Sequence, residues 1–210
     1  MTLALRPTDA LIVVDVQYDF LGGGALAVPD GDAILPLVNR LLPAFAQVVF
    51  TQDWHPAGHS SFASSHPGKQ PFETTSLAYG EQRLWPDHCV QGSPGARLHG
   101  SLDVNRASLI LRKGANSGID SYSAFVEADG RTSTGLAAML RARKVERVFL
   151  CGLATDFCVG FSALDARAAG FETFVVEDAC RGIDAEGSLA AMQARMEAAG
   201  VRRLESTAIH

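Results

Sequence analysis

Short runs of apolar, often β-branched residues alternate along this chain with segments whose apolar residues recur every three or four positions. The run ALIVVDV at residues 10–16 is almost uniformly apolar, which is typical of a strand that is buried on both faces of a sheet. Similar runs predict four further strands, at residues 47–54, 108–114, 147–154 and 172–180. A shorter sixth strand includes Val201 to Leu204.

The segments between these runs have helical spacing. They predict helices at residues 32–46, 133–144, 156–170 and 188–200. Asp32 stands where an N-cap is expected, and Pro36 falls in the first turn, where a missing N–H does no harm. Gly170 and Gly200 stand at the ends of the last two helices, as C-terminal glycines often do.

Strands that alternate with helices at this spacing predict right-handed crossovers and a parallel sheet. We therefore expect one α/β domain over residues 1–210, with three layers (α/β/α) and a mainly parallel sheet of roughly six strands. Residues 55–107 interrupt the alternation and are rich in Gly, Pro, Ser and His. An irregular segment of this length inside a compact domain usually carries function.

Composition and charge narrow the class of protein. Of the 210 residues, 47% are hydrophobic and 20% are charged, which is typical of a globular chain. The net charge of −5, without a clustered basic face, argues against nucleic acid as a partner. The first apolar run is too short for an export signal or a membrane span. Four cysteines without a CxxC pair indicate reduced thiols in the cytoplasm rather than a disulfide framework.

Polar side chains follow four of the predicted strands where each strand ends. Asp15 ends the first strand, Asp53 and His55 follow the second, Lys113 ends the third, and Cys158 comes after the fourth. The carboxyl ends of parallel strands meet at one edge of a sheet, and sites form there. Each residue taken alone also has a non-functional explanation. Asp15 could be a structural residue in a turn, and Lys113 could be a strand-end lysine that extends into solvent.

The segment DWHPAGHSSF offers metal ligands. Asp53 and His55 are two residues apart, so an extended backbone directs both to the same side. His59 lies four residues after His55, but Pro56 and an intervening Gly58 disfavour the helix that this spacing needs. His88 in LWPDHCV can supply the third ligand, although any one of these histidines alone is more often an exposed loop residue. An Asp/His/His set suits Zn²⁺ first, and also Mn²⁺ or Fe²⁺.

Cys158 is the candidate nucleophile. Its position at the start of a predicted helix, with Lys113 nearby, lowers the expected pKa of the thiol. The free N–H groups of a helix start can also bind a developing oxyanion. The alternative is a buried structural cysteine, the account that best fits Cys151 and also Cys180. Cys89 adjoins His88, and the sequence assigns it no role.

Five segments together resemble a known family: VVDVQYDFLGGGALAV, TQDWHPAGHSSFAS, LWPDHCVQGSPGA, RKG and CGLATDFCV. Their order and spacing are similar to those of the bacterial nicotinamidases (pyrazinamidases), a branch of the isochorismatase-like cysteine hydrolases. The resemblance runs from Leu11 to about Cys180. It implies the fold of that superfamily and a catalytic triad of Asp15, Lys113 and Cys158.

The resemblance also implies a metal site at Asp53, His55 and His88, which related amidases lack, with His59 or Ser60 as an extra member of the metal shell. It implies that aromatic side chains enclose the substrate ring. It also implies a cis peptide bond between Leu153 and Ala154, and an oxyanion hole formed by the N–H groups of Ala154 and Cys158. The implied substrate-binding residues are Phe20, Trp85 and Tyr122.

The activity implied by the resemblance is hydrolysis of nicotinamide, and of pyrazinamide, to the acid and ammonia through a cysteine thioester, in NAD salvage. Two alternatives stay open: a cysteine hydrolase that acts on another small amide or an isochorismate-like substrate, and a non-catalytic metal-binding or redox module. The sequence leaves a homo-oligomer open and predicts neither a nucleic-acid nor a membrane partner.

Overall fold

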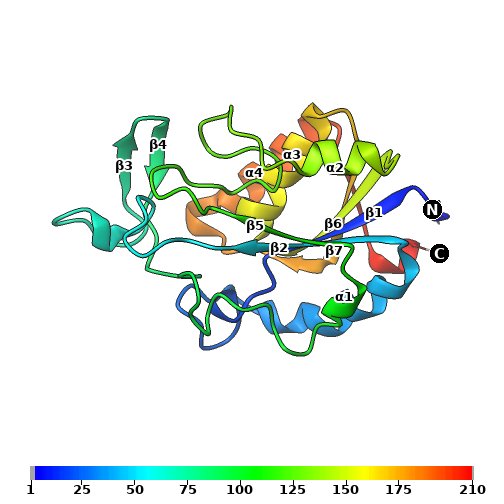
Figure 1. The fold of residues 1–210 in the computed structure, drawn as a ribbon, viewed down its shortest axis with the longest axis horizontal. Helices are drawn as coiled ribbons and strands as arrows, with labels where there is room; N and C mark the ends of the chain where they lie inside the picture. The colour runs from blue at the N-terminus through cyan, green and yellow to red at the C-terminus, as the bar shows by residue number, and fades with distance from the viewer. Residues whose placement is uncertain (1–2, 210) are drawn as a thin grey trace.

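The computed structural model describes residues 3–209, and a six-stranded parallel sheet forms its centre (Figure 1). Neighbouring strands pair in parallel throughout, as the alternation of strands and helices predicts. In spatial order the strands are β5 (Leu109–Lys113), β2 (Gln47–Asp53), β1 (Asp9–Val14), β6 (Arg147–Leu153), β7 (Glu172–Arg181) and β8 (Arg202–Leu204).

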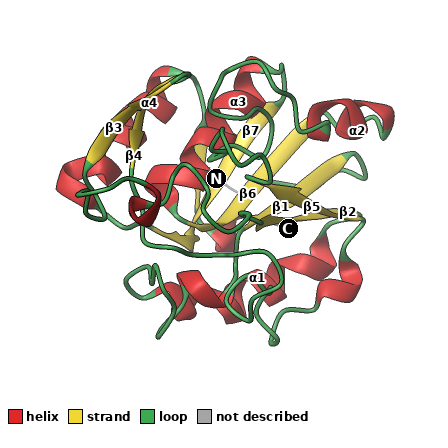
Figure 2. Cartoon of the chain, turned by 60° about the vertical axis from the view of Figure 1, so that its left-hand side comes forward, coloured by secondary structure: helices red, strands yellow, loops and turns green. Residues whose placement is uncertain are grey.

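Helices cover both faces of this sheet (Figure 2). One face carries α1 (Leu35–Leu41), and the other carries α2 (Leu136–Ala142), α3 (Gly160–Ala168) and α4 (Ser188–Ala198). The predicted three-layer α/β/α architecture is therefore confirmed.

The middle strands are buried on both faces because helices lie above and below them. Every residue of β1 and β6 is buried, including Leu11, Ile12 and Val13. Burying an aliphatic side chain of this size contributes about 1.5–3 kcal/mol relative to leaving it exposed. The edge strand β5 has an alternating pattern instead, and its Ile110 is 45% exposed.

The first predicted helix, at 32–46, is shorter than expected. The chain forms a 3₁₀ turn at Gly31–Ile34, then α1, and then a second 3₁₀ turn at Leu42–Ala44. Pro43 explains the early end, since a proline inside a helix has no N–H to donate and clashes with the preceding turn. Asp32 does not cap a helix: its Oδ2 accepts a hydrogen bond from the N–H of Gly22 at 2.8 Å.

The long segment 55–107 contains a small antiparallel hairpin that the sequence analysis did not predict. It consists of β3 (Thr74–Leu77) and β4 (Gly80–Arg83), and it lies apart from the main sheet (Figure 1). Each strand has only four residues, most of them polar, so no apolar alternation marks them. Short 3₁₀ turns at Ala63–Ser65 and Val104–Arg106 are the other regular pieces of this segment.

Within residues 3–209, no helix combines the length and the apolar character that crossing a bilayer requires.

Candidate functional site

Three side chains from three strand ends meet in the interior. The Nζ of Lys113 lies 2.9 Å from Oδ2 of Asp15 and 3.4 Å from Sγ of Cys158. All three residues are buried, with between 0% and 6% of their surface exposed. The structure thus brings together a carboxylate, an ammonium and a thiol that lie far apart in the sequence.

Asp15 is fixed just beyond the end of β1. Its Oδ1 accepts a hydrogen bond from the hydroxyl of Thr51 at 2.6 Å, and its N–H donates to the same hydroxyl oxygen at 3.1 Å. Burial raises the pKa of Asp15, and the nearby charge of Lys113 opposes that increase. A carboxylate with a raised pKa is better suited to accept and return a proton near neutral pH.

Lys113 carries the positive charge of the cluster. Besides Asp15, its Nζ contacts Oδ1 of Asp53 at 2.8 Å and donates to the carbonyl of Ser121 at 2.7 Å. Burial alone would lower the pKa of Lys113, but the charges of Asp15 and Asp53 outweigh it and hold the pKa well above its ordinary value. The side chain is therefore held as an ammonium at neutral pH.

Cys158 differs from the sequence-based expectation in two ways. It lies in a π-helical turn, Thr155–Val159, that leads into α3, rather than in the first turn of a regular helix. The predicted lowering of its pKa is wrong: burial raises the pKa of the thiol well above its ordinary value, and Lys113 only opposes that increase. A thiolate here has to be formed by transferring the proton to a neighbouring base.

A second cluster adjoins the first. One ligand atom from each of Asp53, His55 and His88 lies within 4.8 Å of the others. The Nε2 atoms of His55 and His88 lie 3.2 and 3.6 Å from the same oxygen, Oδ2 of Asp53. Burial would raise the pKa of Asp53, but Lys113 and His55 outweigh it and hold the pKa well below its ordinary value.

The remaining nitrogens of these two histidines show that the set fits a metal ion. Nδ1 of His55 lies 3.0 Å from the carbonyl of Gly114, and Nδ1 of His88 lies 2.8 Å from the carbonyl of Pro86. With each Nδ1–H donating to its carbonyl, the Nε2 atoms beside Oδ2 of Asp53 would be free to bind a metal ion. Backbone carbonyls orient metal-ligating histidines in the same way.

His59 and Ser60, the predicted extra members of the metal shell, lie differently. Nδ1 of His59 accepts from the N–H of Ser61 at 3.2 Å, and its Nε2 lies 2.8 Å from the carbonyl of Asn116, so both ring nitrogens are already engaged. Oγ of Ser60 is buried and has no hydrogen-bond partner among residues 3–209. His59 also belongs to a second candidate ligand group with His55 and Asp120.

Both clusters open into one pocket. The predicted residues Phe20, Trp85 and Tyr122 line it, with Ala154 and Cys158. The Leu153–Ala154 bond is cis, as the resemblance implies. Sequence reasoning missed four further lining residues, which are Leu26, Asp120, Phe157 and Ile183. Phe157 directly precedes Cys158, and Asp120 lies two residues before Tyr122. Proximity in sequence to predicted site residues was therefore the signal that could have found them.

The pocket is narrow and aromatic. Its free volume is about 20 Å³, which is room for roughly one water molecule. The rings of Trp85 and Phe157 stand perpendicular with centroids 4.8 Å apart, and Phe20 lies edge-on to His88 at 5.5 Å.

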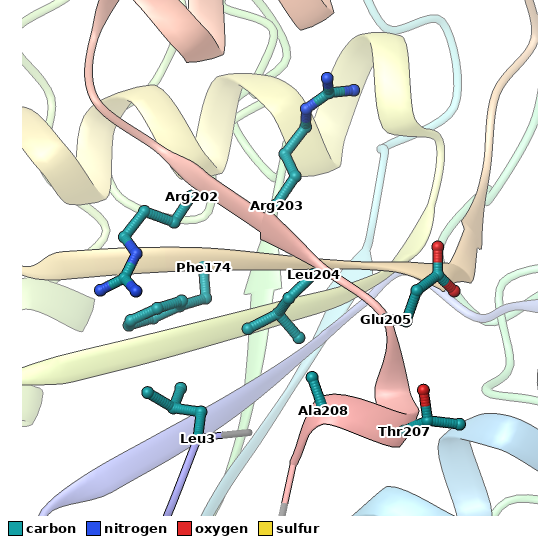
Figure 3. Close-up of a pocket in the computed structure, with 8 residues that line it drawn as sticks. All are labelled: Leu3, Phe174, Arg202, Arg203, Leu204, Glu205, Thr207 and Ala208. Carbon is teal, nitrogen blue, oxygen red and sulfur yellow. The ribbon is translucent and has the colours of Figure 1, made fainter. Parts of the chain in front are cut away.

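A larger hollow lies elsewhere, at the β8 edge of the sheet, with a volume of about 560 Å³ (Figure 3). Leu3, Phe174 and Leu204 line it together with two arginines. Arg202 pairs with Glu172 at 2.9 Å, and Arg203 pairs with Glu177 at 2.8 Å. The described residues that line the hollow include no cysteine and no histidine, and its hydroxyl and carboxylate come from Thr207 and Glu205, so the thiol and the candidate metal ligands lie in the smaller pocket.

Comparison with known proteins agrees with this arrangement. The model of the isochorismatase domain family matches residues 9–207. The chain belongs to the isochorismatase family. Within it, the chain is 55% identical to a nicotinamidase of Acinetobacter baylyi over 94% of this chain and 92% of that protein.

Solved structures of the isochorismatase fold give the same result. A nicotinamidase/pyrazinamidase of Acinetobacter baumannii superposes with a TM-score of 0.95 and 54% identity, covering 96% of this chain and 98% of that one. A pyrazinamidase of Pyrococcus horikoshii, solved in complex with zinc, has a TM-score of 0.76 and 36% identity, covering 95% and 99% of the two chains.

Proposed function

We propose that this protein is a nicotinamidase, which hydrolyses nicotinamide, and also pyrazinamide, to the acid and ammonia in the salvage of NAD. One observation carries the proposal: a buried thiol with its acid–base partners adjoins an Asp/His/His set inside one aromatic pocket. The likeness to nicotinamidases over most of the chain supports it.

In this proposal the pyridine ring lies between Phe20 and Trp85, and its nitrogen faces Asp53, His55 and His88. The carboxamide then lies next to Cys158. Tyr122, whose Oη accepts a hydrogen bond from Nε1 of Trp85 at 2.9 Å, forms a further wall. Positioning the ring in this way brings the carbonyl carbon close to the thiol, which is itself a source of rate enhancement.

The first half of the reaction forms a thioester. Asp15 takes the proton from Sγ of Cys158, and the thiolate attacks the carboxamide carbon to form a C–S bond. The carbonyl electron pair moves to oxygen, where the N–H groups of Ala154 and Cys158 hold the negative charge. Protonated Asp15 then gives its proton to the amide nitrogen, the C–N bond breaks, and ammonia leaves.

The second half returns the enzyme to its starting state. A water molecule gives a proton to Asp15 and attacks the thioester carbon, and the C–S bond breaks. The acid leaves, and the sulfur takes the proton back from Asp15. Lys113 keeps its proton throughout, so its charge stabilises Asp15 and the thiolate whenever either is ionised.

Asp53, His55 and His88 would hold one divalent ion, with Zn²⁺ the first choice and Mn²⁺ or Fe²⁺ as alternatives. When bound, the ion supplies a Lewis-acid contact for the ring nitrogen and lowers the pKa of bound water. The Pyrococcus relative was solved in complex with zinc, which supports a metal ion in this protein, and the close approach of the three side chains supports this donor set.

The decisive experiment measures ammonia release from nicotinamide and from benzamide, before and after chelation. We expect nicotinamide to react much faster than benzamide, which lacks the ring nitrogen, and chelation to remove most of the difference. Equal rates on both amides that do not respond to the chelator would contradict the proposal and favour a metal-independent amidase.

A further inference from the structure

Gln82 is a buried amide in a hairpin that otherwise faces solvent. In β4 its neighbours Gly80 and Glu81 are exposed, whereas Gln82 is only 2% exposed to solvent. The hairpin lies outside the main sheet (Figure 1) and adds little to the central core. A buried amide is unfavourable unless its polar atoms are satisfied, so the partners of Gln82 indicate what it does.

The side chain of Gln82 has four polar partners. Its Nε2 lies 2.6 Å from the carbonyl of Arg83, 2.8 Å from Oδ2 of Asp120 and 3.1 Å from Oη of Tyr122, so its two hydrogens serve three acceptors and one of them is shared. Its Oε1 accepts from the hydroxyl of Tyr79 at 3.0 Å. Two of these partners, Asp120 and Tyr122, line the pocket that holds Cys158.

Gln82 also determines which hydrogen bond Tyr122 can still make. Oη of Tyr122 accepts from Nε1 of Trp85 and from Nε2 of Gln82, so both of its lone pairs are used by the protein. Its phenolic proton is then the one group it can offer to a bound ligand. Burial raises the pKa of Tyr122 well above its ordinary value, so that proton stays in place.

The contact with Asp120 reaches the ammonium of the site. Oδ1 of Asp120 accepts from the N–H of Ser121 at 2.8 Å, and the carbonyl of Ser121 accepts from Nζ of Lys113 at 2.7 Å. By holding Asp120, Gln82 fixes the short segment 120–122, which contributes one acceptor to Lys113 and one wall to the pocket.

We infer that Gln82 is a positioning residue for substrate binding, which acts through Tyr122 and Asp120 from outside the pocket. The inference rests on the proposed function for its assay, since it concerns how the amide substrate is bound. The hydrogen bonds of Gln82 do not reach the thiol or the proposed metal ligands Asp53, His55 and His88. We therefore expect its loss to weaken binding more than it slows turnover.

The test replaces Gln82 by methionine, which has a similar length but neither polar atom. We expect Gln82→Met to raise KM for nicotinamide about tenfold while kcat falls less than threefold. Glu81→Gln, an exposed change on the same strand, should leave both constants unchanged. An unchanged KM in Gln82→Met, or a fall in kcat alone, would overturn the inference.

A double-mutant cycle separates positioning from general destabilisation. In a Tyr122→Phe background, which has no phenolic oxygen to hold, Gln82→Met should raise KM less than threefold further. The same tenfold increase in both backgrounds would overturn the route through Tyr122. If Gln82→Met does not fold, Tyr79→Phe removes only the hydroxyl that orients the amide, and it should raise KM by two- to fivefold.

The test of Gln82 can fail independently of the proposed nicotinamidase activity. If the wild-type protein releases no ammonia from nicotinamide, the proposed function fails. Crystal structures of wild type and Gln82→Met still test the positioning claim: the segment 120–122 should be displaced in the variant. An identical Tyr122 and Ser121 in the two structures would overturn it.

Discussion

Nζ of Lys113 lies 2.9 Å from Oδ2 of Asp15, and neither side chain has any exposed surface. Removing two charges from water is unfavourable by several kcal/mol per ion, so a pair of this kind needs close geometry and further hydrogen bonds to persist. Thr51 supplies one on the Asp15 side, and Ser121 supplies one on the Lys113 side. The pair places a proton acceptor beside Cys158.

Replacing the thiol tests the nucleophile. Cys158→Ala should abolish ammonia release from nicotinamide and leave the bound metal near one ion per chain, because the proposed ligands are Asp53, His55 and His88. Loss of the metal as well would favour the other group near Asp53, which consists of Asp15, Asp53 and Cys158. Cys151→Ala is the matched control, since that buried thiol lies in β6 and has no triad partner. Ammonia release that persists in Cys158→Ala would refute the thioester route.

The pH profile follows from the two raised pKa values. The reactive free enzyme has Asp15 ionised and Cys158 protonated. Activity should therefore rise with pH through the pKa of Asp15, which burial raises above 3.8, and should fall only where Cys158 ionises, above 9.0. The measurement is kcat/KM for nicotinamide from pH 4 to 10. An alkaline limb near pH 7 would show that the thiol is activated by a lowered pKa after all.

Removing the buried ammonium should destabilise the fold. Lys113→Met leaves Asp15 and Asp53 facing each other without a countercharge, and breaking a buried pair in this way costs about 3–5 kcal/mol. Urea unfolding of the metal-free protein measures the change. Lys69→Met is the control, because its pair with Glu73 is exposed and contributes at most about 1 kcal/mol. A loss below 1 kcal/mol in Lys113→Met would mean that one carboxylate is already protonated.

The positions of the site residues could be predicted because parallel strands end at one edge. Asp15, Asp53 and Lys113 follow apolar runs that are plain in the sequence, and the sheet topology then brings them together. The polar hairpin β3–β4 has no such pattern, so neither it nor its buried Gln82 was predicted.

The pKa of Cys158 was mispredicted for a physical reason. Position at a helix start and a neighbouring ammonium both lower the pKa of a thiol, and both can be recognised in a sequence. The depth of burial depends on how the aromatic walls close over the residue, and that is a property of the packed fold. In this pocket burial is the largest influence, so the direction of the shift reverses.

Three candidate ligand groups lie among the described residues, and His55 belongs to two of them; His88 and His59 distinguish these two. His88→Ala should reduce bound metal well below one ion per chain, because Nε2 of His88 lies beside Oδ2 of Asp53. His59→Ala should retain the metal, because the nitrogens of His59 are engaged by Ser61 and Asn116. Elemental analysis after dialysis against a weak chelator measures both variants. Metal lost from His59→Ala but kept in His88→Ala would move the ion to the group that contains Asp120.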